Sequence, residues 1–355
     1  MDKKVFDFLK RFADTPSASG YEQPAQRIWR EYVSPHVDRV ECDVMGNTWG
    51  VVEGADRPRV MLAGHADEVG LMVSYIDDDG FLYFATIGGI DSHLMPGKRV
   101  FVHGSKGPVA GVIGRKPIHL LESDERGKVA KVKDLCIDLG ALNRAEAEKI
   151  AAVGDSVTFA DTLERLQSDR VMGRGLDDKV GSMVVAEVLR RVAAKKSKLA
   201  CGVYGVSTVQ EEVGLRGART CSYGIDPQVG ICVEVTFATD HPGADKKTVG
   251  DIRLGGGPTI NRGPNINPMV FEMLRRTAQK KKIPFQVEAA PRATGTDANV
   301  MQLNRAGVAT GLVTVPLRYM HTSAEVISLE DVERAAALLT EFLFEVNAKI
   351  DWIPR

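Results

Sequence analysis

The chain has 355 residues, which is enough for two domains or for one large domain that carries an insertion. Lys and Arg total 46 against 47 Asp and Glu, so no strong net charge draws the protein onto nucleic acid or an anionic membrane. Hydrophobic residues make up 44% of the chain and charged residues 26%, which excludes disordered and fibrous architectures.

The first 69 residues predict two helices followed by short strands. Apolar residues recur at helical spacing over residues 5–12, and a second helical stretch covers residues 22–32. Strand-like segments follow at residues 51–52 and 59–63. The apolar faces of these helices predict that they pack against a sheet.

From Gly70 to about Ala160 the pattern becomes rich in strands. Residues 71–89 predict two strands around an Asp-Gly turn, and residues 99–116 predict two more around a turn that contains glycine. One helix is expected at residues 144–152, after the capping residue Asn143. We therefore predict an inserted β-rich domain over residues 70–162.

After this insertion, strands and helices alternate. Helices are expected at residues 179–194, 268–281 and 329–348, and strands at residues 201–209, 229–235 and 311–315. Such alternation favours an α/β domain in which a mostly parallel sheet is flanked by helices on both faces. This domain comprises residues 1–69 and 163–355.

The five cysteines indicate neither a disulfide framework nor a thiolate metal site, because their number is odd and no CxxC pair occurs. The N-terminal segment has charged residues where a signal peptide needs an apolar core, and no apolar run reaches about 18 residues. We expect a cytoplasmic protein with no export signal and no membrane span.

Two motifs carry candidate metal ligands near predicted strand and helix ends. His65 and Asp67 follow a strand, and side chains two residues apart share a face, so Asp67 is placed to orient the imidazole. Asp177 and Asp178 stand side by side where a helix should begin. One of them suffices as an N-cap, which leaves the other free to bridge two cations.

Three further segments carry acidic or imidazole side chains inside apolar strands or directly after them. Glu211 and Glu212 come directly after the strand at 201–209, and two adjacent carboxylates there repel each other unless cations or protons compensate them. Glu234 lies inside an apolar strand, where an unpaired carboxylate is costly. His321 follows the strand at 311–315, a position where a lone histidine is more often structural than ligating.

These residues agree in position, because all lie at or near the carboxyl end of a predicted strand, the edge at which open α/β sheets bind ligands. Two imidazoles and several carboxylates, without a cysteine, suit divalent ions such as zinc, cobalt or manganese. The number of ligands fits two ions that share one aspartate.

Five motifs in this order resemble those of one family. The segments GHADEVG, GRGLDDKVG, QEEVGLRGA, VEVT and HTSAEV are similar to those of the M42 metallo-aminopeptidases, which include tetrahedral and glutamyl aminopeptidases of the dizinc peptidase clan. The resemblance covers essentially the whole chain. It implies that the insertion is a PDZ-like domain mediating dimerisation, with dimers assembling into larger shells such as dodecamers.

The resemblance also implies a role for each candidate. His65 and Glu234 would hold one metal, Glu212 and His321 the other, and Asp177 would bridge them. Glu211 matches the general base, and Asp67 matches the acid that orients His65. Glu234 departs from the pattern, because many members have Asp there. The choice of Asp177 over Asp178 as the bridge also comes from the family.

The expected reaction is hydrolysis of the N-terminal residue of a peptide by water that two metals activate, with Glu211 accepting its proton. A dimetal amidohydrolase or deacylase acting on N-acylated amino acids stays open, since Glu234 alters one metal site. A glycoside hydrolase is less favoured. Only 6% of the residues are aromatic, and that chemistry gives His65 and His321 no role.

Overall fold

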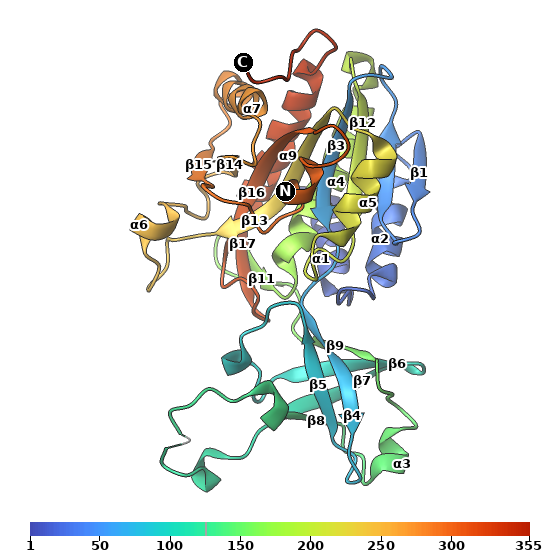
Figure 1. Cartoon of the computed structure of the whole chain (residues 1–355), viewed down its shortest axis with the longest axis vertical. Helices are drawn as coiled ribbons and strands as arrows, with labels where there is room; N and C mark the ends of the chain where they lie inside the picture. The colour runs from blue at the N-terminus through green and yellow to red at the C-terminus, as the bar shows by residue number, and fades with distance from the viewer. Residues whose placement is uncertain (125) are drawn as a thin grey trace.

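The protein consists of an α/β body and a β-barrel, as the computed structural model in Figure 1 shows. The structure describes residues 1–124 and 126–355. Two connections join the barrel to the body. One runs from β3 (Arg59–His65) to β4 (Gly70–Ile76), and the other runs from β9 (Ser156–Phe159) to β10, which pairs with β11 (Arg170–Gly173). The barrel is therefore an insertion after β3.

The body is built on one large mixed sheet. Its strands follow the order β1-β2-β12-β3-β13-β16-β17-β11-β10, and β14 pairs with β16 and with β15. The four central strands, β12, β3, β13 and β16, are parallel, and antiparallel strands extend the sheet on both sides. The remaining strands of this sheet are β1 (Arg39–Cys42), β2 (Thr48–Val52), β10 (Glu164–Arg165), β12 (Gly202–Thr208), β13 (Val229–Phe237), β14 (Thr259–Arg262), β15 (Gln286–Ala289), β16 (Ala309–Arg318) and β17 (Glu325–Ser328).

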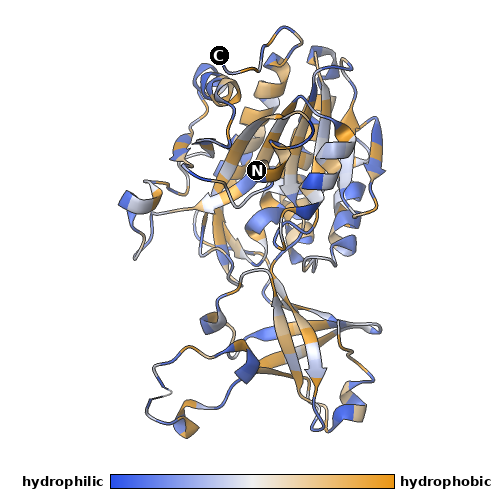
Figure 2. Ribbon diagram, in the orientation of Figure 1, coloured by the Kyte–Doolittle hydropathy of each residue, from blue (hydrophilic) through white to orange (hydrophobic). Residues whose placement is uncertain are grey.

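Helices cover both faces of this sheet. The long helix α4 packs on the central strands and also contacts α1, α2 and α9 (Figure 1). Helices α5 and α8 contact each other and form a second group against the central strands. The body helices are α1 (Lys3–Asp14), α2 (Gln23–Val33), α4 (Leu176–Ala193), α5 (Arg216–Ile225), α6 (Lys246–Val249), α7 (Pro268–Lys281), α8 (Ala298–Met301) and α9 (Leu329–Glu345). Apolar residues concentrate on the strands inside the body, and charged residues lie on the outer helix surfaces (Figure 2).

The barrel is closed and antiparallel, in the order β4-β5-β8-β7-β6-β9. Its apolar core is separate from that of the body. The remaining elements of the barrel are β5 (Leu82–Ile87), β6 (Arg99–Gly104), β7 (Gly107–Gly114), β8 (Cys136–Asp138) and α3 (Arg144–Ala147). The expected hairpins β4-β5 and β6-β7 are thus confirmed, as is an inserted β-rich unit.

Two predicted helices are shorter than expected. The helix predicted over residues 144–152 ends at Ala147, because Lys149 and Ile150 bond carbonyls only three residues back and tighten the chain into turns. The last helix ends at Glu345, and Val346 has extended backbone. All five cysteines are free, and no helix in the described part of the chain is long and apolar enough to cross a membrane.

A close backbone contact sets the distance between β3 and α4. A Cβ atom on Gly64 would lie 2.5 Å from the carbonyl carbon of Gly181 and from the amide nitrogen of Ser182. A Cβ atom on Gly181 would lie 2.3 Å from the carbonyl oxygen of Val233. The strand and the helix therefore approach each other through main-chain atoms, immediately beside His65 at the end of β3.

We predict that Gly64→Ala lowers the free energy of unfolding by about 1–3 kcal/mol, because the added methyl group overpacks this contact. Gly224→Ala is the control. Gly224 is an exposed residue of α5 whose Cβ would meet nothing within 4 Å, so alanine there should stabilise the helix by about 0.5–1 kcal/mol. Urea unfolding measures both, and equal effects at the two glycines would refute the contact.

Candidate metal centre

The parallel strands end in polar residues at one edge of the sheet. β3 ends at His65, and the neighbouring strand β12 is followed after three residues by Glu211. β13 pairs with β3 as far as Cys232 opposite Ala63, so Glu234 lies level with His65 two residues further on. Because carboxyl ends of parallel strands meet at a common edge, the topology brings these side chains together.

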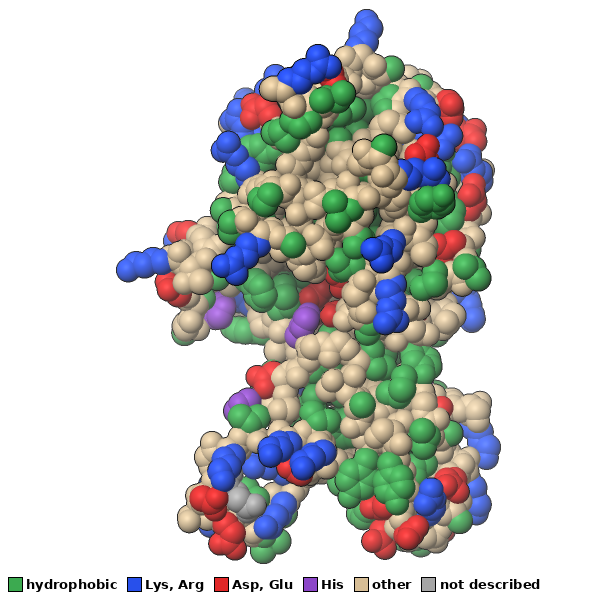
Figure 3. Space-filling model, in the orientation of Figure 1, with side chains coloured by type: hydrophobic (Ala, Val, Ile, Leu, Met, Phe, Trp, Pro, Cys, Tyr) green, Lys and Arg blue, Asp and Glu red, His purple; other side chains and the backbone are tan. Residues whose placement is uncertain are grey.

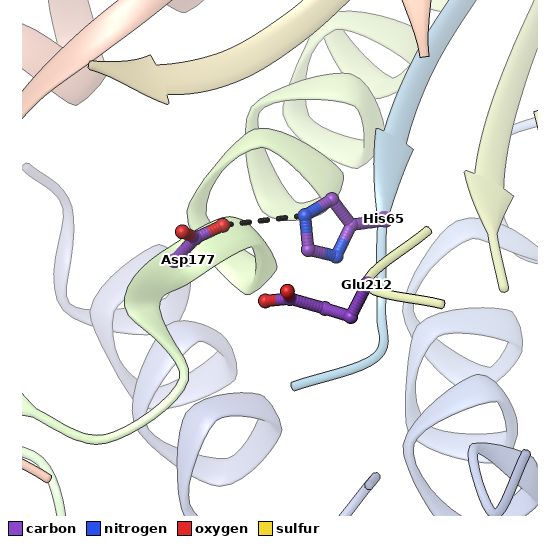
Figure 4. Close-up of side chains that lie close together, drawn as sticks. All are labelled: His65, Asp177 and Glu212. Atoms are coloured by element: carbon purple, nitrogen blue, oxygen red, sulfur yellow. Dashed lines mark ion pairs between the residues drawn. The ribbon is translucent and has the colours of Figure 1, made fainter. Parts of the chain in front are cut away.

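The ligand atoms form two groups that meet at Asp177. His65 Nε2 lies 3.2 Å from Asp177 Oδ1 and 3.5 Å from Glu234 Oε1. His321 Nε2 lies 3.4 Å from Asp177 Oδ2 and 3.6 Å from Glu212 Oε2. Each oxygen of Asp177 therefore faces a different histidine. Figure 4 shows the Asp177 carboxylate facing His65, with the Glu212 side chain extending beside them from a separate element.

Asp178 is held differently from Asp177. Its carboxylate accepts hydrogen bonds from the backbone N–H of His65 at 3.2 Å and of Gly181 at 2.9 Å. It still lies beside His65 and Glu234, and one ligand atom from each of the three falls within 4.8 Å of the others. Asp178 thus joins the end of β3 to the start of α4, while Asp177 keeps both oxygens toward the imidazoles.

Asp67 connects the end of β3 to the turn after β12. Its carboxylate accepts hydrogen bonds from the backbone N–H of Glu211 and of Glu212, both at 3.1 Å, and from the Ser19 hydroxyl at 2.6 Å. The His65 Nδ1 atom lies 3.5 Å from Asp67 Oδ1 and 3.0 Å from its carbonyl oxygen. Burial alone would raise the pKa of Asp67, but the bonds from His65 and Ser19 lower it.

A buried ion cluster lies behind these segments. Glu68 accepts hydrogen bonds from Ser17 N at 2.9 Å and from Lys179 Nζ at 3.0 Å, and it pairs with Arg174. Burial would raise the pKa of Glu68, but the charges of Arg174 and Lys179 lower it to about 2. The cluster fixes the chain after His65 against the segment that carries Asp177.

Negative charge at the site exceeds what the two imidazoles compensate. Burial, followed by the charge of Asp178, raises the pKa of Glu234 well above its ordinary value, and burial likewise raises the pKa of Glu211 and Glu212. Burial would lower the pKa of His65, but the charge of Glu234 raises it. Such mutual repulsion is what bound cations relieve.

The donor set fits divalent cations. Among residues 1–124 and 126–355, Glu211 Oε1 and Glu212 Oε1 are buried and have no hydrogen-bond partner. Buried carboxylate oxygens without partners cost free energy, unless a ligand occupies them. Imidazole nitrogens together with carboxylates are the ligands that zinc, cobalt and manganese accept.

A model of the M42 glutamyl aminopeptidase family matches residues 46–338. The chain belongs to this family of aminopeptidases. It is 38% identical to lysyl aminopeptidase of Pyrococcus furiosus, over 98% of this chain and 99% of the relative. Pyrococcus horikoshii TET1 peptidase, to which the chain is also similar, can assemble into a tetrahedron or a large octahedral shell.

Solved structures agree with this family over the full chain. The TET aminopeptidase of the marine sediment archaeon Thaumarchaeota archaeon SCGC AB-539-E09 superposes with a TM-score of 0.94 at 35% identity, covering 98% of each chain. The Pyrococcus horikoshii peptidase has a TM-score of 0.86 at 31% identity, covering 96% of this chain and 100% of its own.

Sequence reasoning about this aminopeptidase missed two buried acids beside the site. Glu325 accepts hydrogen bonds from the backbone N–H of Asp177 at 3.1 Å and of His321 at 2.9 Å, so it positions both. Asp297 accepts a hydrogen bond from the Thr208 hydroxyl at 2.6 Å and has a buried, unpartnered Oδ1. Glu325 belongs to the HTSAEV motif, so the sequence could have indicated it as a site residue. Asp297 follows a loop, and only the GTD triplet could have indicated it.

A cavity of about 540 Å³ opens beside the carboxylates of the aminopeptidase. Asp177, Glu211, Glu212, Glu234 and His321 line one side of it. On the face shown in Figure 3, acidic side chains lie at the bottom of a hollow with a histidine at its edge. His321 is 36% exposed and His65 only 1%, so the two candidate ion positions differ in their access to solvent.

Proposed function

We propose that this aminopeptidase hydrolyses the N-terminal residue of peptides with two divalent cations per chain and with Glu211 as the general base. The observation that carries the proposal is the arrangement of Asp177, whose two carboxylate oxygens face His65 and His321 separately. Each imidazole also has its own acid, Glu234 for His65 and Glu212 for His321.

These five residues would hold the two cations, with Asp177 shared between them. Zinc suits the donor set best, and cobalt or manganese also fits it. When bound, the cations polarise the scissile carbonyl and lower the pKa of water toward roughly 7. Asp67 fixes the orientation of His65 and, through the two backbone N–H groups, the turn that carries Glu211 and Glu212.

Glu211 is suited to move protons. Its Oε1 has no hydrogen-bond partner in the described residues, and its side chain lines the cavity. The carboxylate accepts a proton as water adds to the peptide carbonyl, and then donates that proton to the leaving amine as the C–N bond breaks. The neighbouring carboxylates offer partners to a free substrate ammonium group, which restricts cleavage to the first residue.

We predict that activity requires both a free N-terminus and a metal. Aminoacyl anilides should be hydrolysed, whereas N-acetyl amino acids and carboxymethylcellulose should not. Chelation should abolish the activity, and zinc, cobalt or manganese should restore it. Release of acetate instead would assign a deacylase, and release of reducing sugar would assign a glycoside hydrolase.

Replacing the general base should reduce turnover without removing the cations. Glu211→Gln should lower kcat by at least about a hundredfold, the scale of general-base catalysis, because the amide cannot accept the proton of water. Elemental analysis should find the same metal content as in the wild type. Glu31→Gln, at an exposed ion pair with Arg11, is the control and should retain wild-type turnover. A kcat of Glu211→Gln close to that of the wild type would remove Glu211 from the mechanism.

We also propose that the β-barrel mediates self-association into dimers and larger assemblies. Exposed apolar side chains on its surface, among them Tyr75, Phe81 and Val112, support this role. The assembly of the Pyrococcus horikoshii peptidase supports it as well. Light scattering should therefore give a molar mass that is a multiple of the 38.6 kDa chain, and the mass of one chain would contradict the proposal.

A further inference from the structure

The cavity beside the candidate metal centre contains one more acid, Glu288, which the proposed chemistry does not use. Glu288 belongs to β15, the outermost strand beyond β14, and not to any element that carries a candidate metal ligand. It is paired in register with Asn261 of β14, which also lines the cavity. A carboxylate in this wall calls for a separate explanation.

Hydrogen bonds fix the Glu288 carboxylate near the strand that bears Glu234. Glu288 Oε1 accepts a hydrogen bond from Thr236 Oγ1 at 2.9 Å. Thr236 lies two residues after Glu234 on β13, so both side chains are on the same face and their Cα atoms are about 7 Å apart. The Glu288 carboxylate is therefore held by a residue two positions from Glu234, and both acids line the same cavity.

The hydroxyl groups around Glu288 donate hydrogen bonds to its carboxylate. Thr259 Oγ1 lies 3.3 Å from Glu288 Oε2 and also contacts the hydroxyl of Thr314. The Asn261 amide donates to Thr259 Oγ1 at 3.2 Å. Burial raises the pKa of Glu288, and the hydrogen bonds from Thr236, Thr259 and Asn261 oppose that rise by stabilising the carboxylate.

In the part of the chain that the structure describes, the Glu288 carboxylate has no basic partner. Within residues 1–124 and 126–355, no Lys, Arg or His forms an ion pair with Glu288, and its hydrogen-bond partners are neutral side chains. Arg292 lines the same cavity, but it is exposed on the loop after β15. Apolar groups, including Leu215, Leu312 and Met320, form other parts of the wall.

We propose that this cavity receives the side chain of the substrate's N-terminal residue and that Glu288 selects a cationic one, lysine or arginine. The inference rests on the proposed function, since it places the substrate's first residue against the candidate metal centre. The apolar wall contacts the methylene groups of a long side chain, and the carboxylate pairs with the ammonium or guanidinium at its end.

The test compares lysyl and norleucyl p-nitroanilides, whose side chains differ mainly by the terminal ammonium group. For the wild type, kcat/KM should be at least about tenfold higher for the lysyl substrate, as expected for one charged hydrogen-bonding pair. Glu288→Gln should remove this preference while leaving the norleucyl value within about threefold of wild type. Arg292→Gln is the matched control and should keep the preference for lysine.

Two results would overturn the inference. A Glu288→Gln variant that loses the same factor on both substrates would make Glu288 a structural partner of Thr236 and Thr259. A wild type that prefers a glutamyl anilide, with Arg292→Gln removing that preference, would assign the pocket to an acidic side chain through Arg292.

A binding measurement separates this inference from the proposed function. Calorimetry on Glu211→Gln compares L-lysine with L-norleucine, and repeats the comparison with Glu288→Gln added. Tighter binding of lysine that the added substitution abolishes would uphold the pocket assignment even if no anilide were hydrolysed, and in that case the proposed function alone would fail. Equal binding of the two amino acids would refute the pocket assignment.

Discussion

Repulsion among buried carboxylates is the constraint on which the functional half of this structure depends. Asp177, Glu211, Glu212 and Glu234 converge on a site where two imidazoles supply the nearby compensating groups. Burial makes that repulsion costly, since little solvent is present to screen it. The fold tolerates the arrangement because its remaining elements hold these acids in place through backbone N–H groups and the ion cluster around Glu68.

The acids of the site differ in the hydrogen bonds that they accept. Asp67, Asp178 and Glu325 accept hydrogen bonds from the main chain, so their charges are stabilised by fixed dipoles. Glu211 and Glu212 each retain a buried oxygen without a partner in the described residues. This division separates acids that shape the site from acids that remain available for ligands and protons.

The sequence allowed the fold class and the convergence of the site residues to be predicted, because strand ends in an α/β pattern are a positional rule. It could not decide between Asp177 and Asp178, since adjacent residues share one place in that pattern and only side-chain direction distinguishes them. Glu288 could not be predicted as a site residue either. It lies on β15, a strand of four residues that alternate between half-buried and exposed, and 52 positions separate it from its partner Thr236. Asp297 could not be linked to Thr208 either, because 89 positions separate the two residues in the sequence.

The contact between Gly64 and Gly181 has a consequence for how this enzyme can diverge. At this point β3 and α4 meet through main-chain atoms, which every amino acid sequence shares, whereas elsewhere α4 packs on the sheet through apolar side chains such as Leu189. Homologues can therefore exchange apolar residues elsewhere in the interior without altering the spacing between the segments that bear His65 and Asp177. The sequence of the body can therefore change while the geometry of the site is kept, provided that residues 64 and 181 remain glycine.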